Sequence, residues 1–120
     1  MVCDSDTHPF KSASEAWAWA AGIFSGEGCA THTFTRGKKY PRLAVCMTDR
    51  DEVEKFARVI GYGNVNYEYT PSQKSRGQAP TWRWSCAKRS EVERICNRLY
   101  PFLGERRQAR MRELGVVDAT

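Results

Sequence analysis

The feature that most restricts the fold of this chain is a pattern that occurs twice: two strand-like segments are followed each time by an amphipathic helix-like segment. The β-rich segments lie at residues 29–36, 40–48, 64–70 and 81–86, with apolar and polar side chains in alternation. This alternation gives each strand one apolar face and one polar face. The four segments therefore predict two hairpins whose apolar face packs on helices and whose polar face stays free.

Four other segments have the three-to-four-residue apolar period of helices. They lie at residues 15–26, 49–60, 90–99 and 103–114. Two of them are expected to begin with capping boxes, formed by Asp49 with Glu52 and by Ser90 with Glu93. The complete order of helix, hairpin, helix, hairpin, helix and helix predicts the α+β class.

The length of the chain bounds its organisation. Its 120 residues are enough for one hydrophobic core, so we expect a single domain over residues 1–120, with a leader at 1–12 and a tail at 115–120. No charged-then-apolar leader or long apolar run is present, which favours a soluble, cytoplasmic protein without a membrane partner. The five cysteines are widely and irregularly spaced, which argues against a zinc ribbon or a disulfide framework.

The charge balance favours an acidic partner. The formal net charge is +5 and the calculated pI is about 9.1, values that suit nucleic acid but equally describe a solvated basic surface. The location of the positive side chains must decide between these two interpretations.

The first helix has an unusual composition and an unusual end. Residues 17–28 read WAWAAGIFSGEG, a run of small and apolar residues that ends on one acid, Glu27, between two glycines. Ser12 or Ser14 is the expected N-cap. A carboxylate at a helix C-terminus meets the negative end of the macrodipole and costs roughly 0.3 to 1 kcal/mol. A divalent cation bound by Glu27 would remove this conflict.

The segment AAGIFSGEG at residues 20–28 resembles the signature of the LAGLIDADG homing endonucleases. Residues 60–65 (IGYGNV) and 100–109 (YPFLGERRQA) also resemble segments of this family, and the order of the predicted helices and strands matches that of the family. The resemblance covers roughly residues 15–114. It implies an αββαββα fold with a saddle-like four-stranded antiparallel sheet, with helices on one face and a polar DNA-binding face on the other.

The chain carries one copy of this motif, and the resemblance implies that such chains work as homodimers with their motif helices side by side. Ala18, Gly22 and Gly26 recur every four residues on one ridge, where small side chains would let two helix backbones approach closely. The alternative is a tight contact of the same ridge within the monomer core.

The dimer would bring Glu27 together with its symmetry mate at the base of the sheet. Two carboxylates and nearby carbonyls suit Mg2+, or Mn2+ in its place, and the Gly26 carbonyl is the expected second ligand. No small-molecule cofactor is expected. The alternative for Glu27 is a solvated acid in a turn.

Other members of the site follow from the resemblance. Asp49 lies after the second strand, where the family often places a polar residue that orders water, although a capping role also explains it. Arg106 occupies the position of a basic residue that organises water or stabilises phosphate charge, and Arg107 is an equal candidate by register. The alternative for both arginines is a solvated basic helix face.

The polar face of the sheet is the expected DNA-reading surface. Arginine suits guanine, asparagine suits adenine, and the methyl group of threonine suits thymine. The alternative is that this face is simply solvated, because any half-buried sheet exposes a polar face to water. Lysines and arginines in the loops would contact phosphates. The expected contacts are Thr31, Thr33, Thr35, Lys38, Lys39, Tyr40, Arg42, Ala44, Cys46, Asn66, Glu68, Lys74, Arg76, Thr81 and Arg83.

Together these features predict a homodimeric, Mg2+-dependent, site-specific DNA endonuclease that makes a staggered double-strand cut in a long, near-palindromic target. The family implies intron or phage mobility and a bacterial or phage-type host. The main alternative is a LAGLIDADG-like DNA-binding regulator or RNA-splicing maturase that does not cut. A basic structural protein without a nucleic-acid partner is the third reading.

Overall fold

The computed structural model describes residues 10–118. Its elements are α2 (Ala13–Glu27), β1 (Gly28–Thr35), β2 (Lys38–Met47), α3 (Arg50–Ile60), β3 (Asn64–Glu68), α4 (Pro71–Ser75), β4 (Thr81–Cys86), α5 (Arg89–Leu99), the 3-10 helix η1 (Tyr100–Phe102) and α6 (Glu105–Leu114). The strands form an antiparallel four-stranded sheet in the order β1-β2-β4-β3. The predicted α+β class is confirmed.

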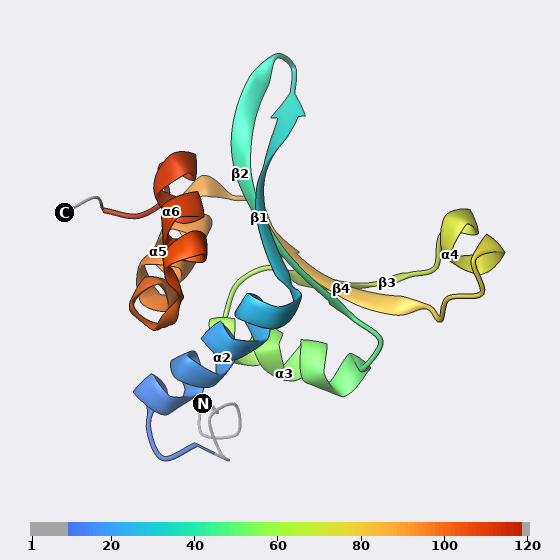
Figure 1. Ribbon diagram of the computed structural model, residues 1–120, viewed down its shortest axis with the longest axis horizontal. Coiled ribbons are helices and arrows are strands. Elements are labelled where there is room, and N and C mark those ends of the chain that lie inside the picture. Colours follow the sequence, from blue (N-terminus) through green and yellow to red (C-terminus); the bar gives the residue numbers. More distant parts are fainter. Residues whose placement is uncertain (1–9, 119–120) are drawn as a thin grey trace.

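The sheet is strongly twisted, and its two hairpins point in different directions (Figure 1). The β1–β2 hairpin extends beyond the helices, while β3 and β4 lead to α4 at another end of the molecule. Helices α2, α3 and α5 pack against β2, and α6 packs against β1. We call the helix-covered side the inner face of the sheet and the opposite side the outer face.

The core lies between the inner face and the helices. Leu43, Val45 and Trp84 are fully buried strand residues, and the Phe56 ring of α3 meets the Trp84 ring edge-on with centroids 5.0 Å apart. The apolar stripe predicted for α5, comprising Val92, Ile95, Cys96 and Leu99, is buried as expected. In α3 the predicted Val53, Phe56 and Ile60 are buried, but the predicted Ala57 is only half-buried and Val59 is buried as well.

The first helix begins and ends close to the predicted positions. Ser12 is the N-cap, and its hydroxyl accepts a 3.1 Å hydrogen bond from the Glu15 backbone N–H. Ser14 lies inside the helix. At the other end the helix includes Glu27, one residue beyond the predicted end, and β1 follows at once with Gly28. No loop separates the acid from the sheet.

Both capping boxes predicted from the sequence are wrong. Asp49 is the N-cap of α3 but its side chain makes no capping hydrogen bond. Ser90 lies inside α5, whose N-cap is Lys88. A capping box does form at α4, where Thr70 and Gln73 hydrogen-bond each other's backbone N–H groups. The spacing alone permits a capping box but does not ensure one, because the N-cap side chain must also reach the N3 backbone N–H.

Two boundaries differ from the expected ones. The turn of the first hairpin falls on Arg36 and Gly37, both with positive φ, so the two lysines that follow belong to β2. In the segment expected to be a tail, Val116 is 1% exposed and belongs to the core. Residues 1–9 of the expected leader lie outside the described residues. Within residues 10–118, no helix is long and apolar enough to cross a bilayer.

Candidate nucleic-acid interface and active site

The strand register places most of the predicted contact residues of the strands on the outer face. Thr31 lies opposite Arg42, and Thr33 lies opposite Tyr40; directly paired residues of antiparallel strands project to the same face. The same parity extends across the sheet through the pairs Thr35–Lys38, Cys46–Arg83, Arg83–Asn66 and Thr81–Glu68. Four strands therefore contribute to one continuous polar surface, as predicted.

Two of the predicted contacts are wrong in placement. Ala44 has the outer-face register but is only 5% exposed, because its single methyl group lies between Cys29 and Ser85 on the neighbouring strands. Lys39 lies in β2 opposite Phe34, with the parity of the inner face, because the turn comes one residue earlier than predicted. Lys38 is the lysine of this pair that lies on the outer face.

The same register adds residues that the sequence analysis missed. Cys29 pairs with Ala44, and Ser85 pairs with Ala44 and Asn64, so all three newly found side chains have outer-face parity. Counting strand positions from the predicted contacts by twos would have found them. Ser85 and Asn64 line a hollow of the outer face together with Thr33, Arg42 and Lys88.

The middle of the outer face holds a compact polar group. The Glu68 carboxylate accepts a 3.7 Å hydrogen bond from the Cys46 thiol across β4, and Arg83 lies between these strands. Within residues 10–118, Nε of Arg83 is buried without a hydrogen-bond partner. A buried donor without a partner is costly, so Arg83 has a donor on the outer face that the described residues leave unused.

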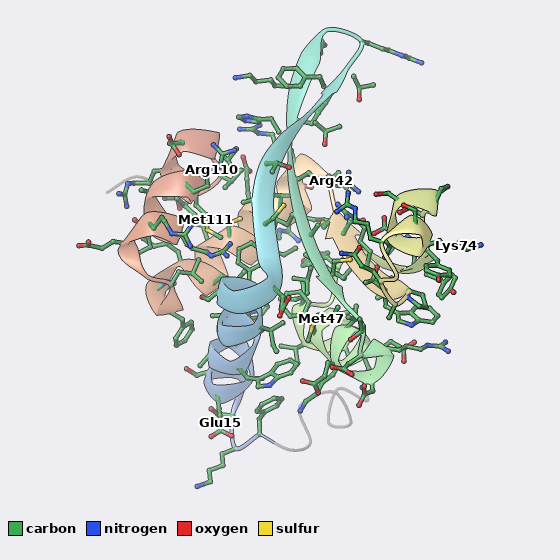
Figure 2. The ribbon with its side chains drawn as sticks, turned by 45° about the vertical axis from the view of Figure 1, so that its right-hand side comes forward. Glu15, Arg42, Met47, Lys74, Arg110 and Met111 are labelled. Carbon is green, nitrogen blue, oxygen red and sulfur yellow. The ribbon has the colours of Figure 1, made fainter. Side chains whose placement is uncertain are left out.

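The basic side chains predicted for phosphate contact, other than Lys39, lie around this face. Lys74 and Arg76 are exposed beyond the end of β3, where the Thr70 capping box orders the connection. The Lys74 ammonium lies 5.2 Å from the Tyr69 ring centroid. Figure 2 shows Arg42 and Lys74 on the side of β2 turned away from Arg110 and Met111 of α6.

Glu27 lies where the first helix meets the sheet. Its side chain is exposed, and it lines a cavity of about 240 Å³ together with Asp49 and Thr81. Two candidate site carboxylates, 22 positions apart in the sequence, therefore share one hollow. Because the Asp49 side chain makes no capping hydrogen bond, the capping role does not account for it.

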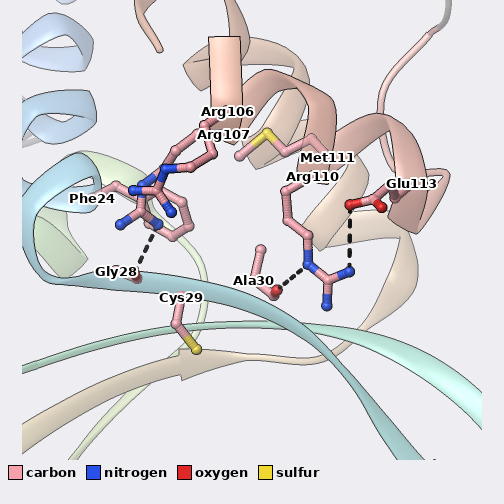
Figure 3. A pocket seen from close by; sticks show the side chains of 9 residues that line it. All are labelled: Phe24, Gly28, Cys29, Ala30, Arg106, Arg107, Arg110, Met111 and Glu113. Atoms are coloured by element: carbon pink, nitrogen blue, oxygen red, sulfur yellow. Dashed lines mark hydrogen bonds and ion pairs between the residues drawn. The ribbon is translucent and has the colours of Figure 1, made fainter. Parts of the chain in front are cut away.

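The two candidate arginines are in different environments. Arg106 is exposed, whereas Arg107 is partly buried at the end of the first helix. Arg107 donates a 2.8 Å hydrogen bond to the Gly28 carbonyl (Figure 3) and a 2.9 Å hydrogen bond to the Ser25 carbonyl. Burial, and next the charge of Arg106, lower the pKa of the Arg107 guanidinium. Of the two arginines, Arg106 is the more exposed.

The donor set of one copy suits a magnesium ion but is incomplete. The Glu27 carboxylate and the Gly26 carbonyl are oxygen donors of the kind that Mg2+ prefers, and no side chain of residues 10–118 donates to the Gly26 carbonyl. The same residues contain no group of three His, Cys, Asp or Glu side chains that could hold a metal. One copy therefore supplies only part of a coordination shell.

The small-residue ridge of α2 is exposed. Ala18, Gly22 and Gly26 all face away from the core, and a Cβ atom added at either glycine would have no neighbour within 4 Å. The interpretation that this ridge makes a tight contact inside the monomer is therefore wrong. The ridge ends at Glu27, next to the outer face.

Comparison with known proteins gives a likeness in fold. No protein-family model and no curated protein matches the chain. The structure is similar to homing endonuclease I-CvuI in complex with its target in the presence of 2 mM Ca, with a TM-score of 0.66 and 17% identity over 86% of this chain and 66% of that chain. The group I intron-encoded homing endonuclease I-CeuI complexed with DNA gives 0.65 and 17%, over 85% and 53%.

A LAGLIDADG meganuclease, I-AabMI bound to uncleaved DNA, is also similar, with a TM-score of 0.63 and 14% identity over 83% of this chain and 34% of that chain. The chain thus spans about two thirds of the length of I-CvuI and about one third of I-AabMI. It has the fold of the LAGLIDADG homing endonucleases, so the resemblance carried by residues 20–28 is confirmed at the level of the fold.

Proposed function

We propose that this chain, with its LAGLIDADG homing endonuclease fold, is a Mg2+-dependent, site-specific DNA endonuclease that acts as a homodimer. The observation that carries the proposal is the position of Glu27. This exposed acid lies at the end of a small-residue ridge, at the edge of a continuous polar sheet face, and in one cavity with Asp49. The proposed DNA-reading surface and the proposed metal-binding carboxylate thus adjoin each other.

The ridge supports the homodimer. Ala18, Gly22 and Gly26 are exposed and recur every four residues, so a second copy of α2 can approach the helix backbone closely. An isologous contact of this kind would place two Glu27 side chains near the two-fold axis. The incomplete donor set of one copy would then be completed by the other copy.

The chemistry assigned to this chain is the hydrolysis of a phosphodiester bond in each DNA strand. When bound, Mg2+ would polarise the scissile phosphate and lower the pKa of a coordinated water. Glu27 and the Gly26 carbonyl would hold the ion, and Asp49 would accept a hydrogen bond from water in the shared cavity. The exposed Arg106 guanidinium would stabilise the negative charge that develops on the phosphate oxygens.

The outer face would lie in the major groove and select the target. Arg42 and Arg83 are suited to bidentate contacts with guanine, and Asn66 is suited to adenine. Lys38 and Lys74 would add affinity through phosphates without reading sequence. A two-fold dimer with one such face per copy reads a long, near-palindromic target, with a staggered cut between the two half-sites. The activity fits a mobile intron or phage element.

The likeness to I-CvuI, which is described in complex with its target, and to I-CeuI, which is described as complexed with DNA, supports double-stranded DNA as the partner. A basic outer rim supports the same partner, because Lys38, Lys74 and Arg76 are exposed around the polar face. These observations weigh against a basic structural protein.

The decisive experiment compares the wild-type protein with Glu27→Gln on a randomised library of duplex DNA, with Mg2+ and with Mn2+. We expect the wild-type protein to select and cut a specific site, and Glu27→Gln to bind the same site without cutting it. Glu93→Gln is the matched control, since this acid forms an exposed pair with Arg89 on α5 and such pairs contribute little. It should cut normally.

The same experiment separates the alternatives. If the wild-type protein binds one sequence tightly but leaves it intact with every metal, the chain is a DNA-binding regulator and the nuclease proposal is wrong. A parallel binding titration with structured RNA tests the third outcome: if the protein prefers structured RNA to duplex DNA, the maturase function replaces the nuclease.

A further inference from the structure

Arg107 connects two elements that are far apart in the sequence. It belongs to α6, yet its Nη1 and Nη2 groups donate to the carbonyls of Gly28 and Ser25, which are 79 and 82 residues away. These two carbonyls flank Glu27. Figure 3 shows the Arg107 guanidinium directed toward Gly28 beside the Phe24 ring, and its central carbon lies 5.4 Å from the ring centroid.

The end of α2 is an unfavourable place for an acid. Carbonyls in the last turn of a helix carry partial negative charge and lack partners within the helix, and Glu27 adds a full negative charge there. A guanidinium at this point offsets both the partial negative charge of the carbonyls and the charge of Glu27, since it is positive and donates to the Ser25 carbonyl of that turn. Its planar fork can also serve two carbonyls at once, which the single ammonium of lysine does less well.

The segment around Glu27 is held on its other side by close packing. The Gly28 N–H donates to the Phe24 carbonyl, and a Cβ atom on Gly28 would lie only 2.4 Å from the Phe24 ring. Hence no side chain fits at position 28, and the backbone of Gly28 lies directly on the Phe24 ring. Phe24 and Arg107 together define the course of the backbone before and after Glu27.

We propose that Arg107 is a positioning residue: it fixes residues 25–28 and thereby holds the Glu27 carboxylate where a divalent ion can bind it. Arg106, whose side chain is exposed, then remains the arginine that acts on the phosphate. This division of roles rests on the proposed function, but the contacts of Arg107 do not. The two neighbouring arginines are thus distinguished by their contacts: Arg107 donates to two backbone carbonyls, whereas Arg106 remains exposed.

The test uses Arg107→Met, Arg107→Lys and the matched control Arg110→Met. Arg110 also links α6 to β1, since its Nε donates to the Ala30 carbonyl at 3.1 Å, but it does not touch the carbonyls beside Glu27. Two quantities are measured: the hydrogen-exchange protection of the Gly28 amide relative to the global unfolding limit, and the Mg2+ concentration that gives half-maximal DNA cleavage.

We expect Arg107→Met to lower Gly28 protection and to raise the half-maximal Mg2+ concentration, each by about tenfold or more, because hydrogen bonds to charged groups are the strong ones. Arg107→Lys should fall between wild type and Arg107→Met, and it keeps the test open if the methionine variant does not fold. Arg110→Met should leave both quantities within about twofold of wild type, since it removes only a remote link.

Equal behaviour of Arg107→Met and Arg110→Met in both measurements would overturn the inference. The exchange measurement also separates it from the proposed function. If the wild-type protein cuts no DNA while Arg107→Met still loses Gly28 protection, the nuclease assignment fails and the structural role of Arg107 stands. If cleavage occurs but neither quantity changes in Arg107→Met, the endonuclease stands and the positioning role is wrong.

Discussion

The indole Nε1 of Trp84 donates a 2.8 Å hydrogen bond to the backbone carbonyl of Tyr62. Trp84 is fully buried at the centre of the sheet, whereas Tyr62 lies in the short connection between α3 and β3. The bond therefore ties the entry of the third strand to the middle of the core. It also brings the chain so close to the indole that only glycine fits at the next position, Gly63.

Gly63→Ala should be one of the most destabilising single-methyl changes in this protein. Gly63 has φ +90°, and an added Cβ would lie 2.5 Å from Trp84 Nε1 and 2.7 Å from the Ser85 carbonyl. We expect a loss of about 3 kcal/mol in the free energy of unfolding, measured by urea denaturation.

Gly61→Ala is the matched control for this change. Gly61 has φ +83° but no neighbour within 4 Å of an added Cβ, so only the left-handed backbone conformation is penalised, at roughly 1–2 kcal/mol. Similar losses for the two variants would mean that the close approach to Trp84 does not exist in solution.

Gly22→Leu should prevent self-association without unfolding the protein. A Cβ atom added at Gly22 has no neighbour within 4 Å, and a leucine there would separate two helices that pack through the small-residue ridge. We expect the wild-type protein to sediment as a dimer and the variant as a monomer with unchanged circular dichroism. If the wild-type protein stays monomeric with and without DNA, the proposal of an active site shared by two copies is wrong.

Arg83→Ala and Lys74→Ala should weaken DNA binding in different ways. Arg83 lies in the middle of the outer face with an unpaired Nε, so its loss should cost about 1–3 kcal/mol of discrimination at one base position. Lys74 lies on the rim, and its loss should lower the slope of log K against log salt by about 0.9 at every sequence. The two effects are measured by binding titrations on single-base target variants at several salt concentrations.

The cysteines should report which surface DNA covers. Burial raises the pKa of the Cys86 thiol to about 11, with a further rise from its hydrogen bond to Glu91, and burial raises that of Cys96 to about 12. Since the thiolate is the reactive species, both should resist iodoacetamide at pH 8 and gain reactivity as the pH rises toward their pKa values.

Cys29 is exposed on the outer face and should be alkylated more than about tenfold faster than Cys96 at pH 8, because Cys96 is buried and its raised pKa leaves very little of it as thiolate. Bound target DNA should slow the alkylation of Cys29, as followed by mass spectrometry of its peptide. Unchanged labelling of Cys29 in a tight DNA complex would place DNA on another surface.

Much of the outer face follows from local periodicity. Thr31, Arg42 and Arg83 could be assigned to one surface from the sequence because side chains in a strand alternate with a strict period of two. The amphipathic stripes of α3 and α5 follow from the same kind of argument with a period of 3.6 residues. Side-chain capping was less predictable, since Asp49 has the right spacing but makes no capping hydrogen bond.

The sequence by itself determined the α+β class, the polar face and Glu27 at the end of a small-residue helix, because each depends on residues close together in the chain. Only the tertiary structure decided that Asp49 shares a cavity with Glu27, that neighbours cover Ala44, and that Arg107 binds carbonyls 79 and 82 residues away while Arg106 stays exposed. Such contacts depend on the path of the whole chain through space, and adjacent arginines on one helix carry no local signal that separates them.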